Sequence, residues 1–344
     1  MSNFSNYNVV RLNTDLFPIT QFEQEKYDEH DIIPEPVEVS SRDDLIENVK
    51  EADAVMVVSE SLPTEVVEAM HRCRVICRIG AGTDKIDVAT ATARGIVVAN
   101  VPDFCVEEQA DHAFALLLAV ARNLRQMHDL MLAGRYLDAQ LQSKRLRRLP
   151  GRTLGLVGFG RSAKAMARRA AGFGIQVLAS RRRPPSVDTD AQALNVSLVS
   201  LDQLLAEYDI VSLHLPLNDQ SRKMFDKATL LKMKRGSVLI NTSRGAIVDE
   251  TALVEVLEDQ HLAGAGLDTF DAIDMHEPEP QPPHHALLEL DNVVFSPHVA
   301  SFSADSSRDV SYGSVANLVA VLAGEWPAAD RIVNTDVRPR QPLR

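Results

Sequence analysis

The chain is poor in cysteine and has no long apolar run. Its three cysteines cannot form a framework of disulfide bonds, and we expect them to be reduced packing residues. The longest apolar stretch, residues 113–121, falls far short of the ~20 residues that a membrane-spanning helix requires. Residues 1–6 contain neither a basic nor an apolar segment, so no secretory signal is visible. These absences predict a cytoplasmic protein.

Positive charge is also in short supply. The chain has 36 lysine and arginine residues against 48 aspartate and glutamate residues, which gives a formal net charge of −12. This balance opposes nonspecific binding to nucleic acid or to an anionic membrane, so we expect neither as a partner. The length of 344 residues and the 45% of hydrophobic residues allow two domains with complete cores.

Short apolar runs, bounded by turn residues, alternate with helical segments along the chain. The runs nearest the start cover residues 9–12, 54–58, 75–79 and 95–99. A second set begins at residue 154 and recurs at residues 175–178, 209–212, 237–240, 264–267 and 293–295. Such alternation is typical of parallel sheets that are covered by helices. We therefore expect two Rossmann-like α/β domains with doubly wound parallel sheets and a cleft between them.

Two reactive side chains follow strands of the second set. Arg244 comes after the run at residues 237–240, and His298 comes after the run at residues 293–295. Ligands of open α/β sheets bind beyond the carboxyl ends of the strands, so both side chains should face one crevice. A guanidinium can bind a carboxylate through two hydrogen bonds, and an imidazole can donate or accept a proton near neutral pH. The pair suits a 2-keto or 2-hydroxy acid, whereas the simpler alternative is a surface arginine and a capping histidine.

A glycine-rich turn lies between a strand pattern and a helical stretch. Gly158, Gly160 and Ala163 form a G-x-G-x-x-A sequence that follows the run at residues 152–157. The first glycine permits a tight turn, the second lets backbone approach a pyrophosphate, and the small third residue permits close helix–strand packing. The N-terminus of the helix would then bind the pyrophosphate. A purely structural glycine turn is the alternative.

With these motifs the chain resembles the D-isomer-specific 2-hydroxyacid dehydrogenase family over nearly its whole length. The matching segments are residues 78–87, 100–102, 158–163, 214–217, 241–250, 264–268 and 297–298. The stretch 106–112 is most similar to the branch that includes the C-terminal-binding-protein corepressors and to bacterial dehydrogenases close to that branch.

The resemblance also implies how the domains are organised. It implies a discontinuous substrate-binding domain, residues 1–102 and 302–344, and a dinucleotide-binding Rossmann domain, residues 103–301. A long helix expected at residues 106–132 would lead into the second domain and pack against a second subunit, giving a homodimer. Burial of that helix within its own domain is the alternative. A helix at roughly residues 304–323 would return the chain to the first domain.

The substrate would be held by one side chain and by backbone. Residue chemistry and the resemblance both assign the substrate carboxylate to Arg244. Backbone N–H groups would complete the cradle, because glycines let main chain approach a small anion; a plain strand-end turn is the alternative. The segment concerned is Ile79, Gly80, Ala81 and Gly82. His298 would protonate the carbonyl oxygen during hydride transfer, which requires a partner that keeps the imidazole charged.

The charged partner departs from the family pattern. In the family a glutamate lies five residues after the aspartate that is Asp268 here, but this position is Ile273. A four-residue insertion would make Glu277 the match, and we prefer it. Asp274 is the rival, with Asp271 behind it, and a site without a carboxylate partner is the remaining option. Three nearby histidines are His276, His284 and His285. They lack the spacing of metal ligands, so we expect a solvated loop and no metal.

The cofactor preference also departs from the family pattern. NAD enzymes place an acidic residue at the end of the second strand of this domain, where it binds the ribose hydroxyls. Here the strand ends in Ser180, Arg181 and Arg182, and the next acid is Asp188. These residues favour a 2′-phosphate through charge-assisted hydrogen bonds, so we predict NADP, with NAD possible. A basic surface turn beside an ordinary NAD site is the alternative.

The resemblance supplies the remaining cofactor contacts. Asp268 would receive the nicotinamide amide, and Thr242 and Ala300 would line the nicotinamide site. The expected dinucleotide contacts are Gly158, Phe159, Gly160, Arg161, Ser162, Ser180, Arg181, Arg182, His214, Leu215, Pro216, Thr242, Ser243, Arg244, Asp268, His298 and Ala300.

We therefore predict an oxidoreductase that reduces a small 2-keto acid, of the glyoxylate or hydroxypyruvate type, to the D-2-hydroxy acid. Two alternatives stay open. One is a dinucleotide-sensing interaction protein of the corepressor type, and the other is a phosphite or formate dehydrogenase on the same scaffold. The presence of both Arg244 and His298 favours the reductase over the corepressor-type protein.

Overall fold

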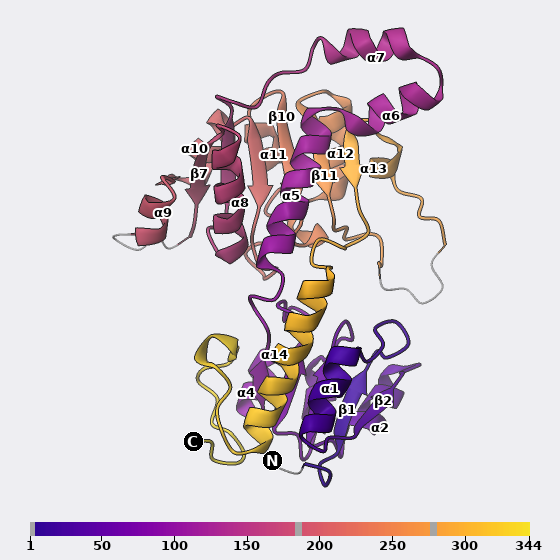
Figure 1. The fold of residues 1–344 in the computed structure, drawn as a ribbon, viewed down its shortest axis with the longest axis vertical. Coiled ribbons are helices and arrows are strands. Elements are labelled where there is room, and N and C mark those ends of the chain that lie inside the picture. Colours follow the sequence, from indigo (N-terminus) through magenta and orange to yellow (C-terminus); the bar gives the residue numbers. More distant parts are fainter. Residues whose placement is uncertain (1–3, 183–187, 276–280) are drawn as a thin grey trace. The chain divides into compact units, whose positions relative to one another are not determined.

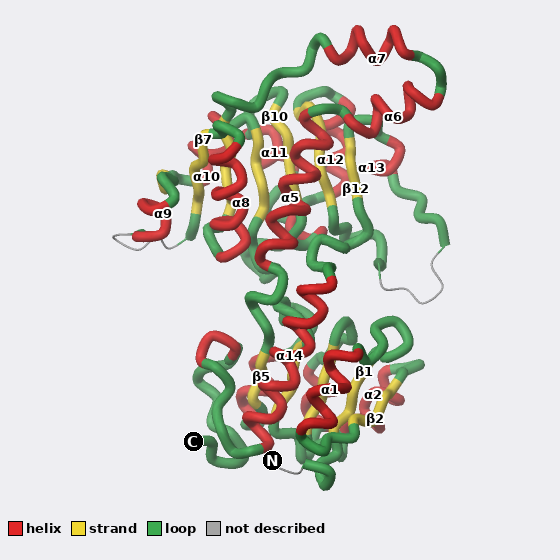
Figure 2. The backbone as a smooth tube through the Cα atoms, in the orientation of Figure 1, coloured by secondary structure: helices red, strands yellow, loops and turns green. Residues whose placement is uncertain are grey.

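The computed structural model describes residues 4–182, 188–275 and 281–344, and the chain divides into two compact units. The first unit comprises Met1–Cys105 and Phe302–Arg344, and the second comprises Val106–Ser301. Each unit contains a parallel sheet with helices on its faces (Figures 1 and 2), which confirms the predicted fold class. No helix in the described ranges is long and apolar enough to cross a membrane.

The first unit is built on a sheet with the strand order β2-β1-β3-β4-β5 in its described part. The strands are β1 (Val9–Leu12), β2 (Pro34–Val37), β3 (Ala54–Val57), β4 (Val75–Arg78) and β5 (Val97–Ala99). The helices are α1 (Gln21–Glu29), α2 (Arg42–Val49), α3 (Thr64–Ala69), α4 (Val88–Ala93), α14 (Ala304–Leu322) and the short 3-10 helix Ala329–Arg331. Alternate residues of β1 enter opposite cores, so the sheet is buried on both faces. Two-sided burial explains the continuous apolar runs in the sequence.

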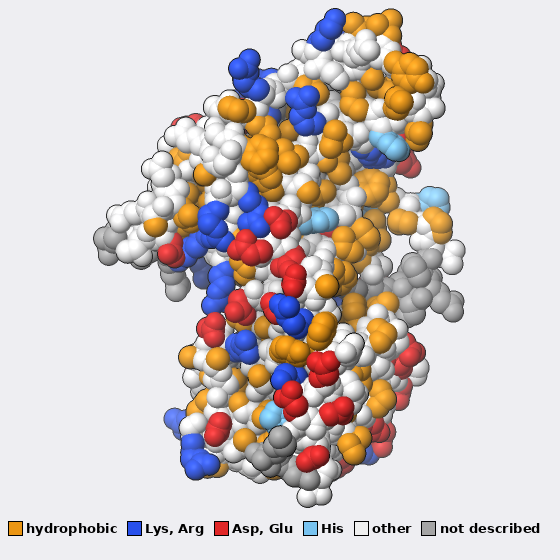
Figure 3. Space-filling model, viewed as in Figure 1, with side chains coloured by type: hydrophobic (Ala, Val, Ile, Leu, Met, Phe, Trp, Pro, Cys, Tyr) orange, Lys and Arg blue, Asp and Glu red, His pale blue; other side chains and the backbone are white. Residues whose placement is uncertain are grey.

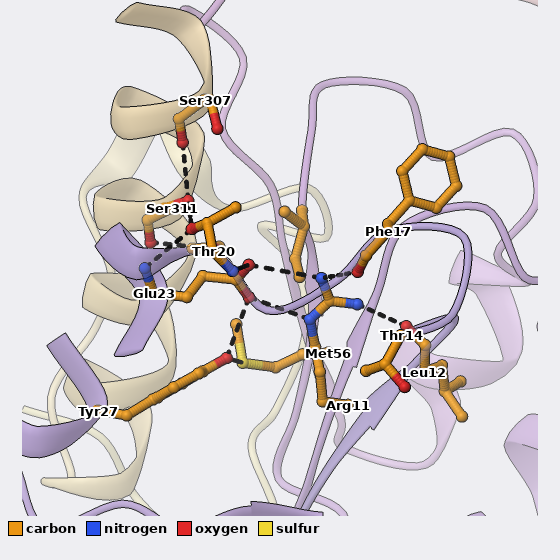
Figure 4. Close-up of polar contacts among 12 residues, drawn as sticks. Arg11, Leu12, Thr14, Phe17, Thr20, Glu23, Tyr27, Met56, Ser307 and Ser311 are labelled. Atoms are coloured by element: carbon orange, nitrogen blue, oxygen red, sulfur yellow. Dashed lines mark hydrogen bonds and ion pairs between the residues drawn. The ribbon is translucent and has the colours of Figure 1, made fainter. Parts of the chain in front are cut away.

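A buried ion pair anchors the loop that follows β1 (Figure 4). The guanidinium of Arg11 and the carboxylate of Glu23 are each about 1% exposed, and Arg11 Nε lies 3.0 Å from Glu23 Oε1. Glu23 also accepts hydrogen bonds from the Thr20 N–H at 3.2 Å and from the Tyr27 hydroxyl at 3.3 Å. The Thr20 hydroxyl in turn lies 2.8 Å from that of Ser311 on α14. A buried charge is tolerated when its partners are this complete, and this network ties β1, α1 and α14 together.

The second unit has a parallel sheet with the strand order β12-β11-β10-β9-β6-β7-β8 in its described part. The strands are β6 (Thr153–Val157), β7 (Gln176–Ser180), β8 (Ser197–Leu198), β9 (Ile210–Leu213), β10 (Ser237–Asn241), β11 (Leu262–Leu267) and β12 (Val293–Phe295). The chain runs outward from β6 to β8 and returns to pair β9 with the other side of β6. Such a reversal of strand order opens a crevice at the carboxyl ends of the strands.

The helices of the second unit cover both faces of this sheet and extend beyond it (Figure 1). They are α5 (Val106–Ala121), α6 (Leu124–Leu132), α7 (Tyr136–Ser143), α8 (Arg161–Gly172), α9 (Thr189–Ala193), α10 (Leu201–Glu207), α11 (Lys227–Lys232), the 3-10 helix Gly245–Ile247, α12 (Glu250–Glu258) and α13 (Ala286–Glu289). The prediction of a single helix at residues 106–132 is wrong, because α5 ends at Ala121 and α6 begins at Leu124. Asn123 between them adopts a left-handed backbone with φ 49°, which no α-helix accommodates.

Candidate active site

The carboxyl ends of the parallel strands in the second unit gather most of the predicted site residues at one edge of the sheet. The first residues after β6, β7, β9, β10, β11 and β12 are Gly158, Arg181, His214, Thr242, Asp268 and Ser296. Arg244 is the third residue after β10, and His298 is the third residue after β12. Strand β11 lies between these two strands in the sheet. The structure therefore places the arginine and the histidine after strands that both neighbour β11.

The glycine-rich turn after β6 leaves its backbone open. Gly158 has φ 92°, and a Cβ atom there would lie 2.2 Å from the carbonyl oxygen of His214, so no other residue fits. A Cβ atom on Gly160 would meet nothing within 4 Å, and Gly160 is the N-cap of the 12-residue helix α8. Open space at the first N–H groups of a helix suits a pyrophosphate. The Phe159 side chain is buried in the core, so only its backbone can reach such a ligand.

His214 links this turn to the sheet. Its Nδ1 atom lies 3.1 Å from the Ser162 hydroxyl, and its Nε2 atom lies 3.0 Å from the Ser212 hydroxyl. Burial lowers the pKa of His214 to about 4, because the charged imidazolium would be poorly solvated there. His214 is thus neutral at physiological pH, with one ring nitrogen that donates and one that accepts a hydrogen bond.

The residues after β7 contain an ion pair that the sequence did not suggest. Arg181 Nη1 lies 2.8 Å from Asp188 Oδ2, and Arg182 is exposed. The hydrogen bond from the Ala191 N–H lowers the pKa of the Asp188 carboxyl most, and the hydrogen bond and charge of Arg181 lower it further. Asp188, the next acid after the strand in the sequence, therefore lies against the arginine that directly follows the strand.

The loop after β10 is held by its own polar side chains. Asn241 Oδ1 accepts from the Ser243 N–H at 3.0 Å, and Asn241 Nδ2 donates to the carbonyl of Arg244 at 2.9 Å. The Ser243 hydroxyl donates to the Leu213 carbonyl at 2.7 Å. The buried Thr242 Oγ1 atom has no hydrogen-bond partner among the described residues, as expected for a group that a ligand completes.

Asp268 organises the loop that carries His298. Its Oδ1 atom accepts from the Ser296 hydroxyl at 2.6 Å and from the Val299 N–H at 3.0 Å, and its Oδ2 atom accepts from the Ala300 N–H at 3.0 Å. Its backbone carbonyl accepts from the N–H of His298 at 2.8 Å. Burial opposes the charged form, but His112, the Ser296 hydroxyl and the N–H groups of Ala300 and Val299 lower the pKa of the Asp268 carboxyl below its usual value.

His298 itself has a left-handed backbone, with φ 56°. This conformation is costly for a residue with a side chain and persists only where the surroundings enforce it. The hydrogen bonds from three successive N–H groups, those of residues 298–300, to Asp268 provide that constraint. The backbone geometry at His298 therefore depends on Asp268.

Sequence reasoning missed two residues of α5 that reach the site loops. His112 Nε2 lies 2.7 Å from the Ser296 hydroxyl and 3.4 Å from Asp268 Oδ1. Gln109 Nε2 donates to the Thr242 carbonyl at 3.4 Å. The signal available in the sequence was two polar residues, one turn apart, on the otherwise apolar face of this helix.

Glu277, the preferred partner of His298, lies outside the described residues, as does His276. The segment before it is held by Glu250, which accepts from the Asp271 N–H at 2.6 Å and the Ala272 N–H at 3.2 Å. Asp274, the rival partner, is exposed.

The prediction of a solvated loop is wrong for His285, because it packs against the same glutamate. Its ring is 16% exposed and lies 3.1 Å from Glu250 Oε2, whereas His284 is exposed. The described ranges contain no cluster of three or more histidine, cysteine or acidic side chains with metal-binding geometry.

In the first unit, the predicted backbone cradle follows β4. The Ile79 N–H donates to the Val57 carbonyl at 2.8 Å, and the Gly80 N–H donates to the Arg78 carbonyl at 2.9 Å. These two groups are therefore engaged within the fold. The N–H groups of Ala81 and Gly82 are the better candidates for an anion, and the Ala81 carbonyl is fixed by Asn100 Nδ2 at 2.6 Å.

Comparison with known proteins agrees with this geometry. The model of the D-isomer specific 2-hydroxyacid dehydrogenase, NAD binding domain, matches residues 114–300. A glyoxylate reductase of Korarchaeum cryptofilum is 41% identical over 297 residues, which cover 85% of this chain and 86% of the relative. The NADPH-dependent glyoxylate/hydroxypyruvate reductase of Sinorhizobium meliloti, solved with NADP and malonate, is 30% identical, with a TM-score of 0.79 over 98% of this chain and 100% of that one. A D-lactate dehydrogenase of Aquifex aeolicus, solved with NAD and lactic acid, is 26% identical, with a TM-score of 0.80 over 95% and 99%.

A pair of parallel α/β units with a dinucleotide-type turn and a histidine loop defines a nicotinamide-dependent dehydrogenase. The chain belongs to the D-isomer-specific 2-hydroxyacid dehydrogenase family, which confirms the resemblance seen in its motifs. It is thus an oxidoreductase that uses a nicotinamide cofactor.

The neutral state of His214 predicts a pH-dependent stability. Its pKa is about 4 in the folded chain, against about 6.5 when unfolded, so the unfolded state binds the proton first as pH falls. The contribution of His214 should therefore lower the free energy of unfolding by about 1–2 kcal/mol between pH 7 and pH 5. In urea unfolding at both pH values, His214→Gln should remove that part of the loss, because glutamine stays neutral. The exposed His71→Gln is the control, and an equal loss in wild type and His214→Gln would contradict the assignment.

Proposed function

We propose that the protein reduces a small 2-keto acid of the glyoxylate or hydroxypyruvate type to the D-2-hydroxy acid. The observation that carries the proposal is the placement of Arg244 and His298 after β10 and β12, with Asp268 of the intervening strand fixing the histidine loop. The reductases named above are similar over most of the chain, which favours this reaction over the corepressor and the phosphite or formate alternatives.

In the proposed reaction each residue acts on a defined part of the substrate. Arg244 of the second unit binds the carboxylate through its planar guanidinium. In the first unit, the N–H groups of Ala81 and Gly82 are the proposed backbone donors to a small anion. His298 donates a proton to the keto oxygen and accepts it in the reverse direction. Glu277, or Asp274 in its place, keeps the imidazole charged. The bound nicotinamide supplies the hydride.

The same site has the features that a dinucleotide requires. The pyrophosphate would rest on the open backbone at Gly160 and the start of α8. The nicotinamide amide would donate to the carboxylate of Asp268, and the partnerless hydroxyl of Thr242 would complete its polar contacts. Residues that would also line the cofactor are Arg161, Ser162, Ser180, His214, Leu215, Pro216, Ser243, His298 and Ala300.

The role of Arg244 is tested by shortening and by conservative replacement. Arg244→Ala should lower kcat/KM for glyoxylate by roughly a hundred- to a thousandfold, because a charged hydrogen-bond partner of the substrate is lost. Arg244→Lys should restore only part of the loss, since it lacks the planar fork. The comparison is made by steady-state kinetics with saturating dinucleotide. An Ala variant with the kcat/KM of the unmodified enzyme would remove the central assignment.

We also propose that the enzyme prefers NADP, because Ser180 and Arg181 stand where NAD enzymes carry an acid. Arg181→Asp should lower kcat/KM with NADPH about ten- to a hundredfold, since one charge-assisted contact with the 2′-phosphate is lost. Asp188→Asn is the matched variant: it keeps an N-cap for α9 but releases Arg181, so NADPH should be used better than before. The preference is refuted if the unmodified enzyme uses NADH with an equal or higher kcat/KM.

We infer a homodimer whose interface includes α5 to α7. Hydrophobic side chains gather over α6 and α7 in Figure 3. The large apolar residues exposed there are Leu124, Met131, Leu132, Tyr136, Leu137 and Leu141, each at least 50% exposed. A contiguous exposed apolar patch of this kind marks a protein interface.

The double change Leu132→Glu and Leu137→Glu should convert the dimer to a monomer, because it places two charges in the apolar interface. The mass is measured by light scattering during gel filtration. Ile33→Glu, at a side chain 79% exposed in the first unit, is the control. A monomeric unmodified protein, or a dimer that survives the double change, contradicts this interface.

A further inference from the structure

Helix α5 approaches the sheet unusually closely at β11, and glycines make this possible. A Cβ atom on Gly266 would lie 2.9 Å from Leu116 Cβ, and one on Gly264 would lie 2.9 Å from Val120 Cγ1. Any larger residue at these positions would force the helix away from the strand. Asp268 lies two residues after Gly266, and His112 lies one helical turn before Leu116. The close packing therefore brings the imidazole within reach of the carboxylate.

The outer side of α5 is fixed as well. Arg169 on α8 lies 2.6 Å from Asp111 and 2.9 Å from Glu107, and Arg168 lies 2.6 Å from Glu107. These pairs are exposed, so each contributes little stability by itself. Together with the buried apolar face of α5, they restrain the rotation of the helix about its axis. The direction in which His112 points is set by this packing.

The hydrogens of the His112 cluster can be assigned by counting donors and acceptors. The carboxylate of Asp268 only accepts, so the single hydrogen of the Ser296 hydroxyl, 2.6 Å away, is donated to it. The Ser296 oxygen must then accept from His112 Nε2 at 2.7 Å. The ring hydrogen therefore resides on Nε2. The chain His112 to Ser296 to Asp268 is polarised in one direction, and this strengthens both of its hydrogen bonds.

We propose that His112 is a positioning residue of the active site, which acts through Ser296 and Asp268 to hold the loop of His298 in its left-handed conformation. The inference rests on the proposed role of His298 in proton transfer. Without the imidazole, the Ser296 hydroxyl loses its donor and is free to rotate away from Asp268. The carboxylate then loses its only side-chain donors among the described residues, and the constraint on residues 298–300 weakens. A displacement of the acid by a fraction of an ångström to 1 Å is enough to slow proton transfer markedly.

The test compares three replacements that differ in where they place an N–H group. The amide nitrogen of glutamine can occupy the place of Nε2, whereas that of asparagine reaches only the place of Nδ1. His112→Ala and His112→Asn should therefore lower kcat roughly ten- to a hundredfold, and His112→Gln should restore most of it. KM for the keto acid should change little, because the Arg244 loop is held separately by Asn241 and Ser243. His71→Ala, an exposed histidine in the first unit, is the control.

A second readout does not depend on turnover. Hydrogen–deuterium exchange of a peptide spanning residues 296–301 should be faster in the Ala and Asn variants than in the Gln variant, with peptides of β6 unchanged. A wild-type kcat in His112→Ala overturns the proposal, as do equal losses in the Gln and Asn variants. If His112→Ala does not fold, the Gln and Asn pair still decides the matter. If the unmodified protein reduces no 2-keto acid, the proposed function fails, but the exchange rates still show whether His112 holds the loop. Faster exchange of residues 296–301 in the Ala and Asn variants than in the unmodified protein supports this role, and equal exchange rates overturn it.

Discussion

The geometry of the candidate active site depends on the hydrogen bonds that the carboxylate of Asp268 accepts. This carboxylate is fully buried, and a buried charge is stable only when hydrogen-bond donors surround it. Its donors among the described residues come from the loop after β12 and from α5, so folding cannot satisfy Asp268 without shaping that loop. The unfavourable φ of His298 is the consequence. The hydrogen bonds that stabilise the charge of Asp268 offset the cost of the left-handed backbone at His298, the proposed proton donor.

The polar contacts of Asp268 depend on close apolar packing between α5 and β11. Gly264 and Gly266 have no side chains, so α5 can lie against β11, and only then does His112 reach the end of the strand. The segment from Gly264 to Asp268 thus combines two roles. Its glycines set the distance between helix and sheet, and its aspartate uses that distance. A larger residue at either glycine would disturb the polar cluster without touching it, because interiors are too densely packed to absorb an extra methyl group.

Most of the strands could be predicted because burial on both faces gives short apolar runs. Two strands were missed, and each lies at one edge of its sheet: β2 contains two prolines, which only an edge strand tolerates, and β8 has two residues. The other edge strands, β5 and β12, were predicted because their residues form apolar runs. The break at Asn123 was missed because apolar residues continue on both sides of it. In the site, residues directly after strands were predictable from topology. His112 and Gln109 were not, because their partners lie 184 and 133 positions away and neither residue belongs to a catalytic motif.

The pair of Arg181 and Asp188 shows how a sequence count can mislead about electrostatics. In the sequence Asp188 is only the next acid after the strand, but its carboxylate lies 2.8 Å from the guanidinium of Arg181. A 2′-phosphate must then compete with Asp188 for the guanidinium, and it is also repelled by that carboxylate. A ribose hydroxyl meets no such competition. Cofactor selectivity is therefore a difference between two opposing contacts, rather than the effect of one arginine. The Arg181 side chain is 35% exposed, so salt screens both contacts. With Asp188 opposing it, any preference for a 2′-phosphate would be smaller than a lone arginine would give.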